Sequence, residues 1–118
     1  MSLNEEERND LRKFLDIIED KKGEQTRVLD MRDHTLATRF FILANGTNPK
    51  HVKAIARNLE EEYPEKPIHK EGAEEGSWVV LDYGEVMVHI FDEDVRLFYD
   101  LDDLWIDRDL PLEALNKA

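Results

Sequence analysis

The fold is decided by residues 78–91, which read Trp-Val-Val-Leu-Asp-Tyr-Gly-Glu-Val-Met-Val-His-Ile-Phe. Two β-branched runs in this stretch flank the dipeptide Tyr83-Gly84, an arrangement that is typical of a β-hairpin. With these two residues as the loop, three pairs are predicted to face each other across the hairpin: Trp78 with His89, Val80 with Met87, and Asp82 with Glu85.

The two faces of this hairpin differ in composition. Because side chains alternate along a strand, one face is purely apolar and is predicted to belong to the core. Its members are Val79, Leu81, Val86, Val88 and Ile90. The opposite face mixes Trp78, Met87 and His89 with two carboxylates. Two interpretations stay open for this second face: a surface that binds a partner, or a face that helices cover.

Two longer helices are predicted from apolar residues at helical spacing. The first begins at a capping box formed by Ser2 and Glu5 and ends at Gly23, the residue expected in the left-handed conformation. The second begins at Asn48, which is followed by a proline suited to the first helical position, and stops at Pro64.

The remaining elements complete an α/β pattern. Strands are predicted at residues 27–31 and 40–44, a short strand at 67–69, and a short helix after Asp92. The chain is therefore predicted to be a single domain, residues 1–118, with residues 106–118 as a C-terminal tail. Its architecture is expected to be a mixed β-sheet of four or five strands packed with helices.

Composition indicates a folded and highly charged chain. Hydrophobic residues make up 41% of the 118 residues and charged residues 37%. The absence of cysteine excludes a disulfide framework, a thiolate zinc site and a cysteine nucleophile. No apolar run reaches the roughly 20 residues that span a bilayer. The N-terminus is acidic, without signal or transit character, so we expect a cytoplasmic protein with no membrane partner.

The net charge of −12 opposes nonspecific binding to nucleic acid and suits a basic protein partner. The charge is unevenly distributed along the chain. Residues 92–118 hold nine acids against three bases, whereas residues 50–57 hold Lys50, Lys53 and Arg57 with no acid.

Residues that could carry chemistry give weak signals. The histidines lie on different predicted elements and lack the spacing of metal ligands, so no metal site is predicted. They are His34, His51, His69 and His89. The segment Gly46-Thr47-Asn48-Pro49 lies where backbone amides can bind an anion, but it lacks the pattern of a phosphate-binding loop and is complete as a helix cap.

One pair of acids approaches a known catalytic pattern. Asp92 and Asp94 follow Gly76-Ser77 in the manner of a nucleotidyltransferase metal site, but Glu93 stands where an apolar residue is usual. Two acids at the start of a helix have a simpler capping role. No serine stands beside a predicted histidine. We therefore predict no catalytic residues, no cofactor and no enzyme activity.

Several segments in one order carry a resemblance to a known family. They are Asp20-Lys21-Lys22, Leu29-Asp30, Gly46-Thr47, His51-Val52, Ala54-Ile55-Ala56, Glu71-Gly72, residues 78–91, Phe98-Tyr99-Asp100-Leu101 and Leu104-Trp105. On these residues the chain resembles, from about Leu11 to Trp105, the ribosomal silencing factor family, also called Iojap-related proteins.

The resemblance implies a fold related to nucleotidyltransferases but without their catalytic residues. It also implies binding to the large ribosomal subunit through a basic ribosomal protein, the one numbered fourteen. That contact would block joining of the ribosomal subunits and repress translation under nutrient limitation, without sequence-specific binding to nucleic acid. Carried over by position, the partner-binding residues are Trp78, Asp82, Tyr83, Gly84, His89, Tyr99, Leu101, Leu104 and Trp105.

One departure from the family pattern and two other classes of function remain. Where the family usually has an acid before its aromatic strand, this chain has Thr38-Arg39-Phe40, so no role of that acid is carried over. The alternatives to a silencing factor are a nucleotidyltransferase-like enzyme and a homodimeric scaffold. The second alternative would use the hairpin face against a second copy of the chain.

Overall fold

Helices and strands follow one another in the order α1-β1-β2-α2-β3-β4-β5-α3-β6. The structure is a computed structural model that describes residues 3–32, 38–99, 109–111 and 115. The bounds of the elements are α1 Glu5–Asp20, β1 Glu24–Asp30, β2 Phe40–Gly46, α2 Pro49–Glu62, β3 His69–Glu71, β4 Trp78–Asp82, β5 Val86–Asp92, α3 Glu93–Tyr99 and β6 Asp109–Leu110.

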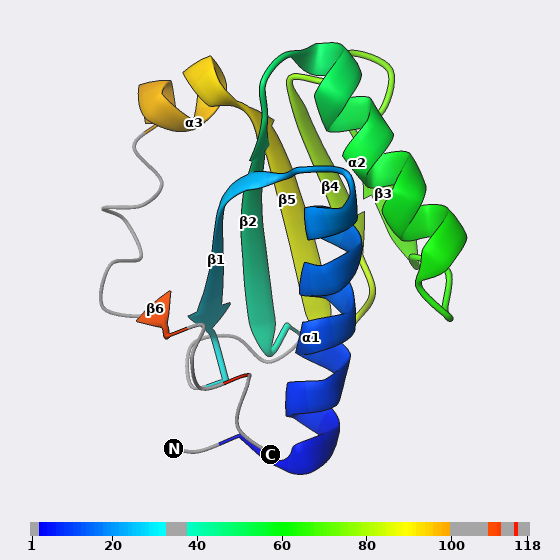
Figure 1. Cartoon of the computed structure of the whole chain (residues 1–118), viewed down its shortest axis with the longest axis vertical. Coiled ribbons are helices and arrows are strands. Elements are labelled where there is room, and N and C mark those ends of the chain that lie inside the picture. Colours follow the sequence, from blue (N-terminus) through cyan, green and yellow to red (C-terminus); the bar gives the residue numbers. More distant parts are fainter. Residues whose placement is uncertain (1–2, 33–37, 100–108, 112–114, 116–118) are drawn as a thin grey trace.

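The described residues form one mixed sheet of six strands in the order β3-β4-β5-β2-β1-β6. Strands β2 and β5 run parallel, and the other neighbouring pairs are antiparallel. Helices α1 and α2 lie on the same face of this sheet (Figure 1). The predicted α/β class is confirmed, but the sheet has more strands than the predicted four or five. The extra strand β6 pairs with β1 through two residues, too few to leave a sequence pattern.

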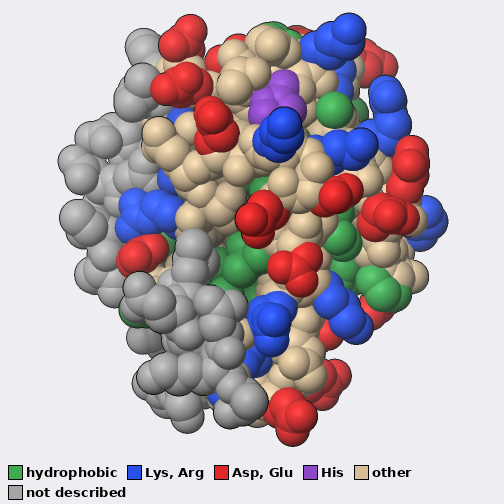
Figure 2. Space-filling view, viewed as in Figure 1, with side chains coloured by type: hydrophobic (Ala, Val, Ile, Leu, Met, Phe, Trp, Pro, Cys, Tyr) green, Lys and Arg blue, Asp and Glu red, His purple; other side chains and the backbone are tan. Residues whose placement is uncertain are grey.

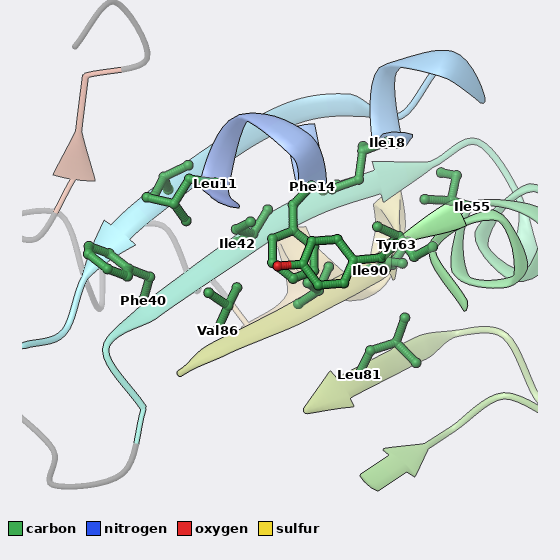
Figure 3. Packing of buried hydrophobic residues seen from close by; sticks show 14 of the residues in the cluster. Leu11, Phe14, Ile18, Phe40, Ile42, Ile55, Tyr63, Leu81, Val86 and Ile90 are labelled. Carbon is green, nitrogen blue, oxygen red and sulfur yellow. The ribbon is translucent and has the colours of Figure 1, made fainter. Parts of the chain in front are cut away.

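The main core lies between the sheet and the two long helices (Figure 3). Leu11, Phe14 and Ile18 of α1 and Ile55 of α2 are buried against it. The five apolar residues predicted for this face are all buried, four of them completely. Burial of each such side chain contributes about 1.5–3 kcal/mol, so this layer supplies much of the stability.

The register of the hairpin differs from the predicted one by two residues. The turn is centred one residue later than predicted: the Tyr83 N–H donates to the Val86 carbonyl (2.9 Å), and the Gly84 N–H donates to Asp82 Oδ1 (2.8 Å). Gly84 has a φ of 92°, which favours glycine. An offset of two residues preserves the assignment of side chains to faces. The observed pairs are Trp78 with Phe91, Val80 with His89, and Asp82 with Met87.

The two ends of α1 also differ from prediction. The capping box is formed by Asn4 and Glu7: the Glu7 N–H donates to Asn4 Oδ1 (2.7 Å), and the Asn4 N–H donates to Glu7 Oε1 (3.1 Å). At the other end, Lys22 has the positive φ, 61°, that was expected at Gly23. Gly23 is required for space instead, because a Cβ there would lie 2.4 Å from Ile18 Cγ2.

The start of α2 agrees with prediction. Asn48 is its N-cap and accepts a hydrogen bond from the His51 N–H (2.9 Å), and Pro49 is the first helical residue. The Thr47 N–H donates to His51 Nδ1 (2.9 Å). These side chains satisfy two backbone amides of the turn, so it is complete as a cap without a ligand.

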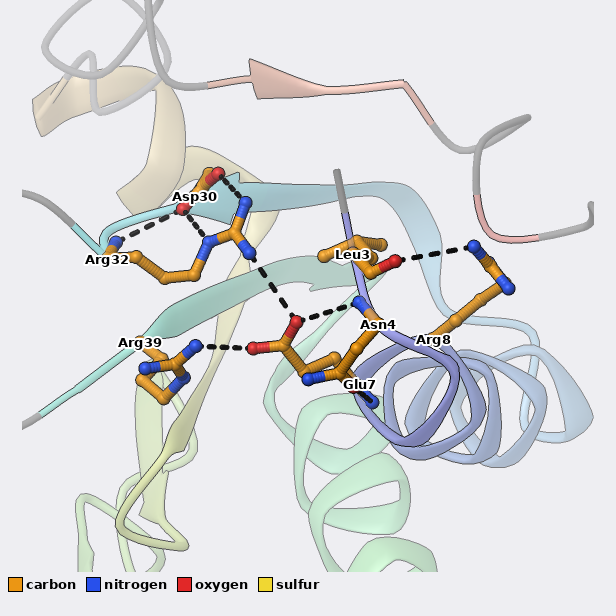
Figure 4. A network of polar contacts seen from close by, with 7 residues as sticks. All are labelled: Leu3, Asn4, Glu7, Arg8, Asp30, Arg32 and Arg39. Carbon is orange, nitrogen blue, oxygen red and sulfur yellow. Dashed lines mark hydrogen bonds and ion pairs between the residues drawn. The ribbon is translucent and has the colours of Figure 1, made fainter. Parts of the chain in front are cut away.

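Arg39, the departure from the family pattern, belongs to an ion-pair network around Glu7 (Figure 4). Its guanidinium lies 2.5 Å from Glu7 Oε2, and Arg32 lies 3.4 Å from Glu7 Oε1 and 2.7 Å from Asp30 Oδ2. Burial alone would raise the pKa of Glu7, but the bonds from Arg39 and the Asn4 backbone, with both arginine charges, lower it below its usual 4.5. The network joins the start of α1 to the end of β1 and the start of β2.

Candidate partner-binding surface

The sheet face opposite α1 and α2 is only partly buried, and we call it the open face. Within the described part of the chain, its apolar cluster contains no residue of α1 or α2; Val95 of α3 packs against it. Leu29, Met31, Leu43 and Phe91 form its buried base. The partly buried side chains of this face on β2, β4 and β5 are Phe41, Trp78, Val80, Asp82, Met87 and His89.

Aromatic rings from three adjacent strands form the centre of the open face. The Trp78 Nε1–H donates to His89 Nδ1 (3.2 Å). The His89 ring lies 5.0 Å from Phe41 and stacks on Phe91 at 6.0 Å with an interplanar angle of 8°. Trp78 lies 5.1 Å from Phe91. These contacts hold the rings in one orientation, so they form a preorganised apolar surface.

His89 is neutral at physiological pH. Burial lowers its pKa from 6.5 to about 4, and the bond from Trp78 occupies Nδ1, so the ring proton is on Nε2. This buried Nε2–H meets no hydrogen-bond acceptor among the residues that the structure describes. His89 therefore acts as a hydrogen-bond acceptor that orients the indole and not as a charged group.

Asp82 and Gly84 lie where the hairpin turns. Because the Asp82 carboxylate accepts the Gly84 N–H, it determines the shape of the turn as well as adding negative charge to the open face. Asp82 pairs with His69 of the edge strand β3 in the sheet register. The turn thus lies beside the short edge of the sheet, at the opposite end of β4 from Trp78.

Tyr83 lies on the other side of the sheet from the aromatic cluster. Its ring packs edge-on against Phe14 (5.0 Å) and Tyr63 (5.1 Å) beneath the helices. Its hydroxyl is buried without a partner in the described portion of the chain, and burial raises the pKa of Tyr83. The structure therefore brings together Trp78, Asp82 and His89 from the predicted set, and places Tyr83 with the core.

The other predicted contact residues lie at or beyond the end of α3. Tyr99 is the last residue of that helix, and its side chain is not described. Leu101, Leu104 and Trp105 lie outside the described residues. Their role in binding stays a prediction.

Three partly buried residues of the open face were absent from the set carried over by family resemblance: Phe41, Val80 and Met87. Alternation along the hairpin had already assigned Val80 and Met87 to this face. Phe41 could have been found from the alternation in strand 40–44, because Phe40 is buried in the helix-side core and its neighbour must face the other way. Its position beside Met87 depends on the parallel pairing of β2 and β5, for which the sequence has no local signal.

Candidate metal ligands are not clustered among the described residues. In residues 3–32, 38–99, 109–111 and 115, no group of three or more His, Asp or Glu side chains is placed to hold a metal ion. The Asp94 N–H lies 3.3 Å from Asp92 Oδ1, which agrees with a capping role for this pair. None of the helices that are described is sufficiently long and apolar to cross a membrane.

Comparison with known proteins gives consistent results. The family model "Ribosomal silencing factor during starvation" matches residues 4–118. A ribosomal silencing factor from Bacillus subtilis is 38% identical over 101 residues, which cover 83% of this chain and 84% of that protein. One from Halalkalibacterium halodurans is 40% identical over 93 residues, 76% of this chain and 80% of that protein. A mitochondrial Iojap-related protein from Arabidopsis thaliana is 28% identical over 99 residues, 75% of this chain and 52% of its own length.

Two solved structures have the same fold. A crystal structure from Bacillus halodurans is 35% identical with a TM-score of 0.75, covering 86% of this chain and 96% of that one. A crystal structure from Chromobacterium violaceum is 31% identical with a TM-score of 0.78, covering 87% of this chain and 88% of that one.

Proposed function

Because the chain belongs to the family of ribosomal silencing factors, we propose that it binds the large ribosomal subunit through a basic ribosomal protein, the one numbered fourteen. Bound there in the cytoplasm, it blocks joining of the two ribosomal subunits. Translation is thereby repressed under nutrient limitation. The protein acts by steric exclusion, so it needs neither catalytic residues nor a cofactor.

The observation that carries this proposal is the aromatic centre of the open face. Trp78 is partly buried, oriented by His89 and left uncovered by α1 and α2. Tryptophan is enriched among the residues that dominate binding energy at interfaces. Because the ring is already held in place, little conformational entropy is lost when a partner covers it.

Charge supports a basic partner. The chain carries a net charge of −12, and Asp82 on the open face and Glu71 at the adjacent edge add carboxylates beside the aromatic rings. Exposed ion pairs contribute only about 0–1 kcal/mol each, so the aromatic residues should determine the affinity. The acids should mainly accelerate association, and this rate should fall as salt screens the charges.

Replacement of Trp78 by alanine tests the binding surface. We expect Trp78→Ala to weaken binding to the isolated ribosomal protein and to the large subunit by about 2–4 kcal/mol, because truncation removes the central ring. Isothermal titration calorimetry and co-sedimentation measure the two affinities. Ile68→Ala is the matched control: Ile68 is 76% exposed and precedes His69, so it points to the other side of the sheet.

Two results would contradict the proposal. If Trp78→Ala binds as tightly as the unchanged chain while circular dichroism shows both folded, the interface lies elsewhere. If the unchanged chain binds the large subunit but leaves subunit joining unaffected in light-scattering measurements, the steric mechanism is wrong. Light scattering of the chain alone at several concentrations tests the homodimeric alternative, which predicts a dimer that Trp78→Ala dissociates.

A further inference from the structure

Five basic side chains gather where α1 ends and α2 begins, and we call them the basic stripe. Lys50 and Arg57 are exposed and Lys53 is half-buried on α2, and the spacing of these three residues places them along one side of the helix. Lys21 and Lys22, both exposed, follow the end of α1. Figure 2 shows blue side chains around the upper end of α2, beside the purple histidine. The stripe is a local basic region on a strongly acidic chain.

A hydrogen-bonded histidine holds the two parts of the stripe together. His51 Nδ1 accepts the Thr47 N–H, so the proton is on Nε2, which donates to the Lys21 carbonyl (2.7 Å). This bond fixes the C-terminal end of α1 against the first turn of α2. The lysines after α1 and the cations of α2 therefore belong to one surface.

The cations of the stripe form no ion pair within the described part of the chain. Some basic side chains outside the stripe pair with carboxylates: Arg27 with Asp109 (2.9 Å) and Lys70 with Glu60 (2.8 Å), in addition to the pairs around Glu7. None of the five stripe residues has a carboxylate of the described residues within 4.0 Å. The first turn of α2 also contains no acid, whereas that of α1 contains three.

The stripe lies on the helix side of the sheet, close to the segment that leads into the Trp78 end of β4. A Cβ on Gly76 would lie 2.9 Å from Lys53 Cε and 2.8 Å from the Pro49 carbonyl, so α2 packs closely on the segment that leads into β4. Trp78 follows two residues later. A partner that covers Trp78 and extends past this end of the sheet would therefore reach the stripe.

We propose that the basic stripe contacts the phosphate backbone of ribosomal RNA when the open face is bound to its protein partner. The inference rests on the proposed function, because the net charge of −12 repels free RNA and the contact requires that the chain is already held beside it. Lysine and arginine on phosphate confer no sequence preference. The stripe would therefore add affinity and orientation without sequence-specific recognition.

Two triple variants with equal loss of charge test the proposal. One is Lys50→Gln, Lys53→Gln and Arg57→Gln, which removes the stripe cations on α2. The control is Arg12→Gln, Lys13→Gln and Lys66→Gln, which removes three exposed cations elsewhere. Five of the six replaced residues lie in α1 or α2, where glutamine is a good helix former, so both variants should fold. Their affinities for the purified large subunit and for the isolated ribosomal protein are measured at several salt concentrations.

We expect the stripe variant to bind the large subunit about tenfold more weakly than the control variant at low salt. The logarithm of its association constant should also fall less steeply with the logarithm of salt concentration, by about 0.7 for each phosphate group that the variant no longer binds. Both variants should bind the isolated ribosomal protein equally. A photoreactive amino acid at position 50 should crosslink to ribosomal RNA.

Three outcomes would overturn the inference. The first is equal affinity of both variants for the large subunit. The second is an equal loss of affinity for the isolated ribosomal protein, which would place the stripe in the protein interface. The third is a crosslink from position 50 to protein alone, which would identify an acidic protein segment as the occupant. Failure of the unchanged chain to bind the isolated protein would instead contradict the proposed function.

Discussion

The two faces of the sheet are built by the same strands, yet they differ in packing and chemistry. On the helix side, Val79, Leu81, Val88 and Ile90 are completely buried aliphatic residues. On the open face, the intervening positions of the same hairpin carry Trp78 and other partly buried side chains. The helix side supplies the stability of a folded domain, so the open face can be adapted to binding. Under the proposed function, this separation lets one hairpin provide both the core and the binding surface.

The largest expected effect comes from comparing one residue on each face. Leu81→Ala should lower the free energy of unfolding by about 2–5 kcal/mol, because it leaves a cavity in a completely buried site. Met87→Ala, on the partly buried face, should cost clearly less. Urea denaturation followed by circular dichroism measures both. Equal losses would mean that the two faces contribute alike and would remove the distinction.

A second comparison concerns acid sensitivity, which we expect to originate on the open face. The folded chain keeps His89 neutral down to about pH 4, whereas the unfolded chain protonates it below about pH 6.5. The unfolded state therefore binds more protons in this window, and stability falls as the pH is lowered. Between pH 7 and pH 5 this effect should amount to about 2 kcal/mol.

Thermal unfolding of His89→Gln at both pH values checks this prediction. The variant should lose that part of the pH dependence, while His69→Gln, at an exposed position of the sheet edge, should keep it. An unchanged pH dependence in His89→Gln would show that the acid-sensitive group lies outside the open face.

The smallest expected effect concerns the ion pairs that join α1 to the sheet. Because Arg39 is 44% exposed, Arg39→Gln should cost at most about 1 kcal/mol. Glu7→Gln should cost more, since Glu7 also pairs with Arg32 and closes the capping box. Because the pKa of Glu7 is lowered in the folded chain, its ionised carboxylate contributes fully to stability above pH 4.5. This stabilisation is lost as the pH falls further. Chemical denaturation of both variants at pH 7 and at pH 4 measures these losses of stability. If Arg39→Gln and Glu7→Gln cost the same free energy of unfolding at pH 7, the larger role assigned to Glu7 is wrong.

The sequence predicted the faces of the hairpin better than its register. Alternation alone assigns Leu81 to the core, and an error of two residues in the loop leaves that assignment unchanged. The turn itself lies one residue later than predicted, where the Asp82 carboxylate accepts the Gly84 N–H. The cap of α1 was misplaced because the sequence offers the same spacing twice: Ser2 with Glu5 and, two residues later, Asn4 with Glu7. The structure uses the second pair.

The candidate site was predicted in part. Trp78 and His89 meet as expected on one face, although they form a diagonal pair and not a direct one. Tyr83 was placed with them by family resemblance. By the alternation of side chains, however, it falls on the same side as Val79 and Leu81, and its ring packs with the core. Local sequence patterns could not predict that Phe41 lies beside Met87, because the two residues are far apart in the sequence and meet only through the pairing of β2 with β5.

The parallel pairing of β2 with β5 has a consequence for folding. Phe41 lies beside Met87, and α2, β3 and β4 separate the two strands along the chain. The β4–β5 hairpin has local contacts and should form early, whereas β2 can join it only after a long loop has closed. We therefore expect the aromatic rings of the open face to come together at a late step of folding. We expect a partly folded chain to lack a competent docking surface, so that newly made copies engage the ribosome only after maturation.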